Sequence, residues 1–474
     1  MDADRVSAIV LAAGAGSRFG GGKLLAPLAG RPILQHVLDR LAEDGFREVV
    51  AVLGDDATDV EAAIDWRSER RIRNPDPSLG LSSSLRLGVA AVDASSEAAL
   101  IALGDQPLLS HEAVAALLAA GVEADRPIAA PVYPADGGRN PVLVGRAAFD
   151  SVAATSGDRG LGPILAAHPE LVRDVPIDVI RGNPDVDTRA DLVALLEASW
   201  GERVRENAAQ VDRRREVPDG SDFYAPVTGL FRADPARTDE PALDALLALV
   251  RPAERWLDIG AGAGRYALPI ARALAASGGS VLAVDASRGM LDVLGELAEE
   301  HGISNVDVVL DRWPPSDPTP FASDVALIAH VGYDIEAIGP FVEAMEASAG
   351  RLCVAALTER QPASVADVCW PPVHGEARVS LPALPEFVEL LRARGREPSI
   401  ERLEREPRRF ASRDELAGFL RRQLWTEPGS AADARFQAAL DESIETDADG
   451  RVGLVDQRPL PIGIVTWAPR GGPA

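Results

Sequence analysis

One glycine-rich stretch of the chain has the composition of a phosphate-binding loop. Residues 11–23 read Leu-Ala-Ala-Gly-Ala-Gly-Ser-Arg-Phe-Gly-Gly-Gly-Lys and follow directly from an apolar run at residues 8–13. Glycine lets a backbone curl with its amide groups turned inward, and such a turn binds anions. Arg18 and Lys23 add local positive charge to a chain whose formal net charge is −25. The stretch therefore predicts a triphosphate site, with these residues around the nucleotide: Leu11, Ala12, Ala13, Gly14, Gly16, Ser17 and Lys23.

Lys23 is the only lysine among the 48 lysine and arginine residues of the chain. A compact ammonium group can follow a phosphate as its charge moves, whereas a planar guanidinium suits fixed bidentate pairing. We therefore expect Lys23, together with Arg18, to stabilise the negative charge that develops in a reaction at phosphorus. The alternative is that a single lysine has survived by chance.

Two carboxylates could hold a metal ion beside this loop. Asp105 follows a buried run at residues 99–103, and ligands of open α/β sheets bind at such strand ends. Asp187 precedes a helical pattern at residues 188–198 and could reach the same ion. Mg²⁺ is commonly bound by one or two carboxylates together with substrate phosphates. The sequence therefore predicts Mg²⁺ at Asp105 and Asp187; a turn aspartate and a helix cap are the respective alternatives.

A helical pattern at residues 81–92 begins with further polar groups. Ser82, Ser83 and Arg86 would offer amides, hydroxyls and a guanidinium to an anion at a helix N-terminus. Asn74 could also face a nucleotide, although an asparagine before proline commonly serves a turn.

A second glycine turn lies in the other half of the chain. Gly260, Gly262 and Gly264 alternate strictly, Asp258 precedes them, and Asp285 ends the next apolar run about twenty residues later. This spacing lets a ligand lie over the glycines while Asp285 accepts hydrogen bonds from ribose hydroxyls. A dinucleotide site has its third glycine three residues after the second, so the alternation favours a different nucleoside ligand.

Several polar residues follow later strands of this half. Asp311 ends a strand pattern at residues 306–310, and a turn aspartate is its alternative. His330, Tyr333 and Asp334 follow a pattern at residues 325–329, where they could line an acceptor site or supply a base. The aromatic segments at residues 368–374 and 410–425 could shape the same site, and core packing explains them equally well.

The elements that must position these residues alternate between strand and helix. Strand patterns recur at residues 8–13, 49–53, 99–103, 128–132 and 141–144, and again at 255–259, 280–285, 306–310, 325–329 and 351–357. Helical patterns separate many of them, which predicts two doubly wound, Rossmann-like α/β domains with mostly parallel sheets covered by helices on both faces. The expected domains are residues 1–198 and 239–474. The Arg-, Glu- and Pro-rich residues 199–238 are expected to form a linker.

Composition excludes several classes of partner and site. The net charge of −25 argues against nucleic acid and anionic membranes. No apolar run approaches the length of a membrane span, and no basic segment precedes the first apolar residues. Cys353 and Cys369 lack metal-ligand spacing and give no disulfide framework. We expect a cytoplasmic protein that acts on small molecules.

The first half resembles the MobA-like nucleotidyltransferases, and most closely the molybdenum cofactor cytidylyltransferases. The resemblance covers residues 6–198 and rests on ordered motifs at residues 11–28, 30–34, 80–86, 103–107, 139–143, 157–160 and 187–188. It implies that the loop and Lys23 hold the nucleotide phosphates and that Asp105 holds magnesium. At Ala13 the sequence resembles the cytidylyl branch of the family, which uses CTP. Asn140 departs from the histidine that this branch often carries.

The second half, residues 239–467, resembles class I methyltransferases that use S-adenosylmethionine. The resemblance implies that Asp258 and the turn of Gly260, Gly262 and Gly264 hold the methionine part of the cofactor. It further implies that Asp285 binds the ribose and that Asp311 lies near the adenine.

The expected function is bifunctional: CMP transfer from CTP to molybdopterin with release of pyrophosphate, and methyl transfer to an unknown small molecule. A molybdoenzyme or its maturation factor is a possible partner. One alternative has a sugar phosphate or other small phosphate as acceptor. Two others are a non-catalytic protein that delivers cofactor, and a second half that only binds its ligand.

Overall fold

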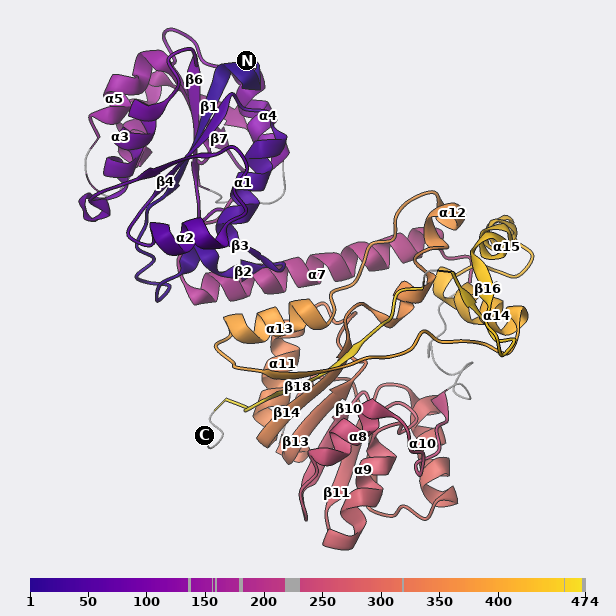
Figure 1. The fold of residues 1–474 in the computed structure, drawn as a ribbon. Coiled ribbons are helices and arrows are strands. Elements are labelled where there is room, and N and C mark those ends of the chain that lie inside the picture. Colours follow the sequence, from indigo (N-terminus) through magenta and orange to yellow (C-terminus); the bar gives the residue numbers. More distant parts are fainter. Residues whose placement is uncertain are drawn as a thin grey trace. The chain divides into compact units, whose positions relative to one another are not determined.

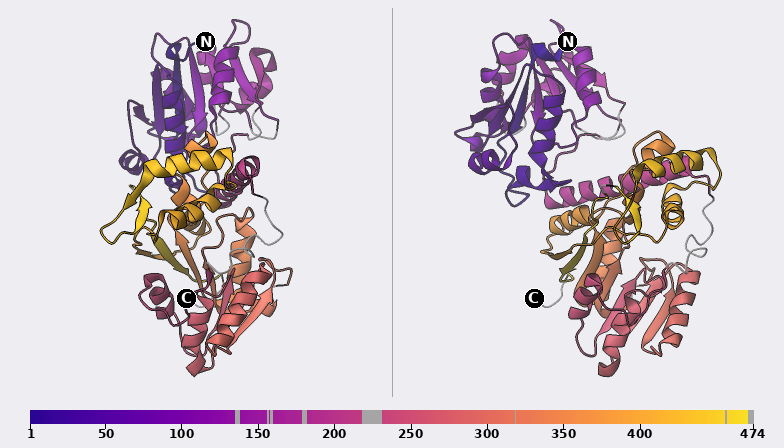
Figure 2. Two further views of the ribbon diagram at one scale, coloured as in Figure 1. Left: turned by 90° about the vertical axis from the view of Figure 1, so that its right-hand side faces the viewer. Right: turned by 45° about the vertical axis from the view of Figure 1, so that its right-hand side comes forward.

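The computed structural model describes residues 1–134, 138–155, 157, 160–178, 182–217, 231–317, 319–455 and 457–470. The chain divides into two compact units, Met1–Ala194 and Leu195–Ala474. Each unit contains one seven-stranded sheet with helices on both faces (Figures 1 and 2). Four of the six strand pairings in each sheet are parallel. The predicted fold class is therefore confirmed.

The sheet of the first unit has the order β5-β4-β1-β6-β8-β7-β9. The strands are β1 (Val6–Ala12), β4 (Glu48–Leu53), β5 (Arg70–Arg73), β6 (Ala98–Leu103), β7 (Ile128–Val132), β8 (Val142–Gly145) and β9 (Val172–Pro176). β1 is buried at every position and pairs in parallel with both β4 and β6. The carboxyl ends of β1 and β6 therefore bring the glycine loop and Asp105 to one edge of the sheet.

Alternate side chains of β1 face two separate cores. Ala8 and Val10 belong to a cluster with Leu34 of one helix, while Ile9 packs with Leu85 of another. This alternation follows from the two-residue period of a strand that is covered on both faces. The helices are α1 (Ile33–Glu43), α2 (Ala57–Ala63), α3 (Leu81–Ala91), α4 (His111–Ala120), α5 (Phe149–Ala153) and α6 (Gly162–Ala167), and a hairpin of β2 (Pro27–Leu28) and β3 (Arg31–Pro32) precedes α1.

The sheet of the second unit has the order β12-β11-β10-β13-β14-β18-β15. Its parallel strands are β10 (Arg255–Ile259), β11 (Ser280–Asp285), β12 (Val306–Leu310), β13 (Ser323–Ala329) and β14 (Ala349–Thr358). The antiparallel strands are β18 (Ile462–Trp467) and β15 (Ser399–Leu403). Helices α8 (Pro241–Ala248), α9 (Ala267–Leu274) and α10 (Arg288–Glu300) cover one face, and α11 (Ile338–Ser348) and α13 (Leu384–Ala393) cover the other (Figure 1).

A long excursion separates β14 from its neighbour β18. Thr358 and Ile462 are opposite each other in the sheet, so residues 359–461 leave and return at adjacent positions. Part of this excursion has its own core, built by α12 (Trp370–His374), α14 (Arg413–Leu424), α15 (Ala431–Ser443), β16 (Ile444–Thr446) and β17 (Val452–Leu454). Trp370 and Phe410 are buried within that core. Packing therefore accounts for aromatic residues that could have lined an acceptor site.

The helix expected at residues 188–198 continues well into the expected linker. It forms α7 (Arg189–Arg214), and the division between the two units falls inside it. Residues 199–214 are thus helical rather than irregular, whereas residues 218–230 of the expected linker lie outside the described residues. The buried positions of this part include Trp200, Val204, Asn207 and Gln210, so one face of the helix is buried although two of these residues are polar. No helix in the described ranges combines the length and apolar character needed to cross a bilayer.

Candidate active sites

Lys23 lies between the two carboxylates predicted to bind a metal. Its Nζ is 2.5 Å from Asp105 Oδ2 and 3.3 Å from Asp187 Oδ1. Arg18 reaches the same group, with its Nη2 atom 2.9 Å from Asp187 Oδ2. The structure therefore brings together four residues that are up to 169 positions apart in the sequence.

Hydrogen bonds attach the segment around Asp187 to the end of β6. Val186 N donates to Asp105 O at 3.0 Å, and Gln106 Nε2 donates to Asp185 Oδ1 at 2.7 Å. The start of α7 is capped by Thr188 and Asp191: Asp191 N donates to Thr188 Oγ1, and Thr188 N donates to Asp191 Oδ2. Because these two residues cap the helix, the side chain of Asp187 is left to face Lys23.

The charges at this site shift two pKa values. Burial alone would lower the pKa of Lys23, but Asp105 and Asp187 outweigh it and raise that pKa. Lys23 therefore stays an ammonium over the physiological range. Burial and the neighbouring Asp105 raise the pKa of Asp185.

The donor set suits a metal that is also bound by a ligand. Asp105 Oδ1 is buried and has no hydrogen-bond partner within the described ranges. No group of three or more carboxylate, histidine or cysteine side chains is arranged for a metal in the part of the chain that the structure describes. Two carboxylates are nevertheless what Mg²⁺ uses when phosphate oxygens and water complete its shell.

The glycine loop closes partly on itself. Phe19, Gly20 and Gly21 all donate their amides to Gly16 O at 3.0 to 3.2 Å. Gly16 has a φ of +57°, and a Cβ there would lie 3.1 Å from Lys23 Cβ, so glycine permits the close approach of the lysine. In this conformation the three amides stabilise the turn itself.

The two serines predicted at the helix start differ in their surroundings. Ser82 Oγ is buried and finds no hydrogen-bond partner among the described residues. Ser83 Oγ accepts from Asn74 Nδ2 at 2.7 Å and lies 2.8 Å from Gly80 O. Arg86 Nη1 donates to Thr155 O at 2.8 Å. Ser82 is therefore the hydroxyl available to a ligand, while Asn74, Ser83 and Arg86 hold the surrounding loops.

Two other motif positions add little to this site. Asn140 O accepts a hydrogen bond from Tyr133 Oη at 2.9 Å. Residues 158 and 159, part of a motif of the family resemblance, lie outside the described residues.

We predict that alanine at Ser82 weakens ligand binding, whereas alanine at Ser83 lowers stability. Ser83→Ala removes an acceptor from Asn74 and should lower the free energy of unfolding by about 1–2 kcal/mol. Ser82→Ala should leave the melting temperature unchanged and weaken triphosphate binding about tenfold, because a hydrogen bond to a charged group is worth roughly 1.5–3 kcal/mol. Thermal denaturation and calorimetric titration with CTP measure the two quantities. Equal effects of the two substitutions on binding would contradict the assignment.

The second glycine turn brings its predicted residues together. Gly260, Gly262 and Gly264 all have positive φ values, and a Cβ at Gly260 would lie 2.4 Å from Val331 Cγ2. Asp285 Oδ2 accepts from Gly262 N at 2.8 Å, which fixes the acidic side chain against the turn. Asp311 continues from the adjacent strand, where its amide donates to Asp285 O at 3.1 Å.

Asp258 is buried beneath this turn. Its Oδ1 has no hydrogen-bond partner in the portion of the chain described here. Burial and the nearby Asp285 raise the pKa of Asp258 to about 7. A cationic ligand over the turn would favour the ionised form, so the site suits a positively charged nucleoside.

We predict that affinity for S-adenosylmethionine rises with pH and levels off above about pH 7. The raised pKa keeps Asp258 protonated at lower pH, and binding of a cation must then displace that proton. The expected slope is up to about tenfold in affinity per pH unit between pH 5 and 7. The Asp258→Asn variant should bind S-adenosylmethionine more weakly, with an affinity that does not change with pH. Calorimetric titrations across this range test the prediction, and a wild-type profile without slope would refute it.

His330 and Tyr333 lie beyond β13, at the same edge of the sheet. His330 has a φ of +58°, and its buried Nδ1 has no hydrogen-bond partner as far as the described residues extend. Burial and the charges of Arg405 and Arg265 lower the pKa of His330 to about 4, so the ring is neutral. Tyr333 Oη lies 2.9 Å from Thr358 Oγ1, and burial raises its pKa to about 12. Asp334 is exposed.

Comparisons with known proteins match both halves of the chain. A family model for the MobA-like NTP transferase domain matches residues 8–172, and one for a methyltransferase domain matches residues 257–338. Nicotine blue oxidoreductase of Paenarthrobacter nicotinovorans is 35% identical over 201 residues, which cover 40% of this chain and 96% of that protein.

Two further similarities concern the first unit. The bifunctional protein GlmU of Sorangium cellulosum is 38% identical over 133 residues, 26% of this chain and 28% of that protein. A solved homologue of Mycobacterium tuberculosis Rv0371c, from Mycobacterium sp. strain JC1, is 30% identical with a TM-score of 0.37. It covers 40% of this chain and 95% of its own. The chain belongs to the MobA-like NTP transferases and carries a methyltransferase domain in the same polypeptide.

Proposed function

We propose that the first unit transfers CMP from CTP to a phosphate of molybdopterin or its molybdenum form. The observation that carries this proposal is the convergence of Lys23, Asp105 and Asp187 at the carboxyl ends of β1 and β6. An acceptor phosphate oxygen would attack the α-phosphorus in line, and pyrophosphate would leave. Such a reaction depends on positioning and on charge neutralisation more than on covalent catalysis.

The residues of the site have distinct roles in this proposal. Asp105 and Asp187 would hold Mg²⁺, which when bound neutralises charge on the phosphate oxygens. Lys23 and Arg18 pair with these carboxylates before the nucleotide binds. We infer that both cations shift toward the triphosphate once a divalent ion takes over the carboxylates. Ser82 Oγ would donate a hydrogen bond to an oxygen of the triphosphate.

The choice of CTP and molybdopterin rests on the family resemblance. Ala13 follows the cytidylyl pattern, while Asn140 departs from the usual histidine, so the acceptor is the part most in need of a test. The similarity to nicotine blue oxidoreductase makes a redox reaction a second candidate. The ammonium group of Lys23, between two carboxylates, favours transfer of a phosphate group over a redox reaction.

Pyrophosphate release tests the proposal directly. Purified protein is incubated with Mg²⁺ and each of CTP, GTP, ATP and UTP, and with molybdopterin or a sugar phosphate as acceptor. We expect release only with molybdopterin and fastest with CTP. Pyrophosphate release with a sugar phosphate and not with molybdopterin would reject molybdopterin as the acceptor. No release from any combination would reject transferase activity and favour cofactor delivery or redox chemistry.

We propose that the second unit uses S-adenosylmethionine as methyl donor. The cofactor would lie over the turn of Gly260, Gly262 and Gly264, with its ribose on Asp285. S-adenosylmethionine supplies an activated methyl group, and alignment with a nucleophilic acceptor can suffice for its transfer. His330, neutral and half-buried at the same edge, is a candidate to accept a proton. Calorimetry should detect cofactor binding that is lost in Asp285→Ala; absence of binding by the unaltered chain would reject this proposal.

A further inference from the structure

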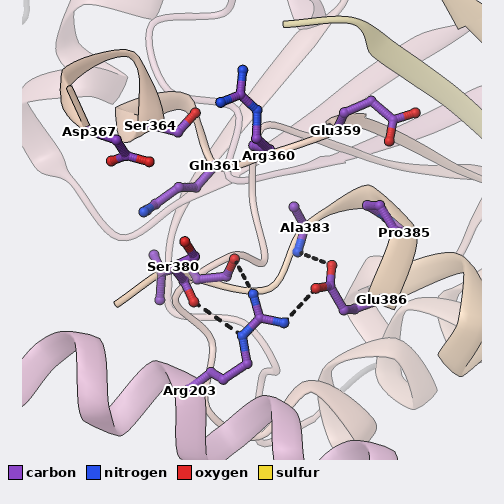
Figure 3. Close-up of a pocket in the computed structure, with 11 residues that line it drawn as sticks. Arg203, Glu359, Arg360, Gln361, Ser364, Asp367, Ser380, Ala383, Pro385 and Glu386 are labelled. Carbon is purple, nitrogen blue, oxygen red and sulfur yellow. Dashed lines mark hydrogen bonds and ion pairs between the residues drawn. The ribbon is translucent and has the colours of Figure 1, made fainter. Parts of the chain in front are cut away.

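A cavity with several polar side chains in its lining lies beyond the carboxyl end of β14 in the second unit. Its volume is about 100 Å³. Residues after β14, the segment before and at the start of α13, and Arg203 of α7 line it (Figure 3). A buried water needs roughly 10–15 Å³ of such volume, so the cavity has room for several waters or for one small molecule.

Along one wall of the cavity, the polar groups form hydrogen bonds with one another. Arg203 donates from Nη1 to Glu386 Oε1 at 2.5 Å and from Nε to Ser380 O at 3.1 Å. Glu386 Oε2 in turn accepts from Ala383 N at 2.9 Å (Figure 3). This wall is therefore neutral and fixed, and its polar groups are already paired.

The opposite wall carries three polar atoms that make no hydrogen bond to any described residue. Gln361 Nε2, Ser364 Oγ and Asp367 Oδ1 are buried without a hydrogen-bond partner in the ranges that the structure describes. Gln361 is 4% exposed and Ser364 is 7% exposed. The side chain of Gln361 extends between Asp367 and Ser380 in Figure 3. Buried polar groups are almost always paired in folded proteins, so these atoms indicate a ligand that completes them.

The chemistry of these atoms defines the ligand. Gln361 Nε2 can only donate, whereas a carboxylate at Asp367 only accepts. Arg378 Nη1 lies 3.5 Å from Asp367 Oδ1, which leaves room for a closer donor. Arg360 adds a second guanidinium to the lining. The cavity thus offers donors for an oxygen anion and, separately, an acceptor for a cation.

We propose that this cavity binds a small zwitterion of the amino-acid type. Its carboxylate would accept from Gln361 and Ser364, and its ammonium would donate to Asp367. Hydrogen bonds link one residue of the lining, Arg360, to Tyr333 beyond β13: Thr358 Oγ1 is 2.9 Å from Tyr333 Oη and donates to Arg360 O at 2.5 Å. Binding at this site does not depend on methyl transfer.

Calorimetric titration of the full chain with three probes tests the proposal. L-alanine carries both charges, propionate only the carboxylate and ethylamine only the ammonium. We expect alanine to bind at least about tenfold more tightly than either fragment, since each charged hydrogen bond contributes to affinity. Gln361→Met should weaken alanine binding about tenfold while the melting temperature stays equal or rises, because the substitution removes an unpaired buried amide.

Asp258→Asn is the matched control. It alters the proposed site for the methionine part of S-adenosylmethionine and should leave alanine binding unchanged, which separates that site from this cavity. No binding of alanine to the unaltered chain would show that the cavity holds only water and would overturn the proposal. Unchanged binding in Gln361→Met would overturn it as well. Loss of S-adenosylmethionine binding alone bears on the proposed function and not on this site.

Discussion

Replacing Lys23 with alanine is expected to lower the rate of pyrophosphate release by about 100- to 1,000-fold. Loss of one preorganised donor at a site of developing charge commonly costs this much. The ammonium lies 2.5 Å from Asp105, and Lys23 as a residue is only 8% exposed, so water cannot readily supply the lost charge. Single-turnover measurements with saturating CTP and acceptor separate this effect from weaker binding. A rate within threefold of the unaltered protein would remove Lys23 from the mechanism.

Lys23→Arg is the informative control for charge. Lys23 is the only lysine among the 48 lysine and arginine residues, so arginine is the basic residue that this sequence otherwise uses. A planar guanidinium keeps the charge but cannot occupy the compact position beside Gly16 in the same way. We expect an intermediate rate, and full activity of Lys23→Arg would show that charge alone matters. Comparison of the melting temperatures of Lys23→Ala and Lys23→Arg shows whether Asp105, left without a cation in Lys23→Ala, destabilises the first unit.

Deletion of residues 1–238 is expected to leave a second unit that does not fold. Trp200 in the second part of α7 is buried, donates from Nε1 to Ile335 O at 2.9 Å and packs edge-on against Phe387. Asn207 and Gln210 hydrogen-bond to the backbone of the segment before α13. Loss of a buried tryptophan costs about 3–5 kcal/mol, and each lost hydrogen bond costs about 1 kcal/mol more. Together these losses approach the whole stability of a domain, which is about 5–15 kcal/mol.

A chain that begins at residue 189 is the matched comparison. It retains α7 in full and should show a cooperative thermal transition and binding of S-adenosylmethionine. Circular dichroism and calorimetry of the two truncated chains make the comparison. A cooperative transition in the shorter chain at the same temperature as in the longer one would contradict the role given to α7.

The central strands were predictable because parallel strands buried on both faces appear as continuous apolar runs. β10, β11 and β12 have the bounds predicted from the sequence. The outer strands were missed for a physical reason. β15 reads Ser-Ile-Glu-Arg-Leu and is mostly exposed, and β18 pairs with a strand more than a hundred positions earlier. The second part of α7 was missed because it buries Asn207 and Gln210, which apolar periodicity does not register.

Much of the candidate site was also predictable, because parallel strands place their carboxyl ends together. Strand ends indicated where the glycine loop with Lys23 and Asp105 would lie, and the position of Asp187 before a helix indicated that it could reach them. The different hydrogen bonding of Ser82 and Ser83 could not be predicted, because it depends on which serine the side-chain amide of Asn74 contacts. The pairing of Arg18 with Asp187 was equally hidden, because a sequence does not show which cation a carboxylate faces before its ligand binds.

The adjacent departure and return of the chain at Thr358 and Ile462 have an evolutionary consequence. The segment leaves one strand and returns in the neighbouring strand at paired residues. It can therefore be lengthened, shortened or replaced without breaking the strands that carry the glycine turn. Loop closure of such an insert costs little more as it grows. Selection can therefore diversify recognition by this unit in residues 359–461 while the catalytic framework stays constant.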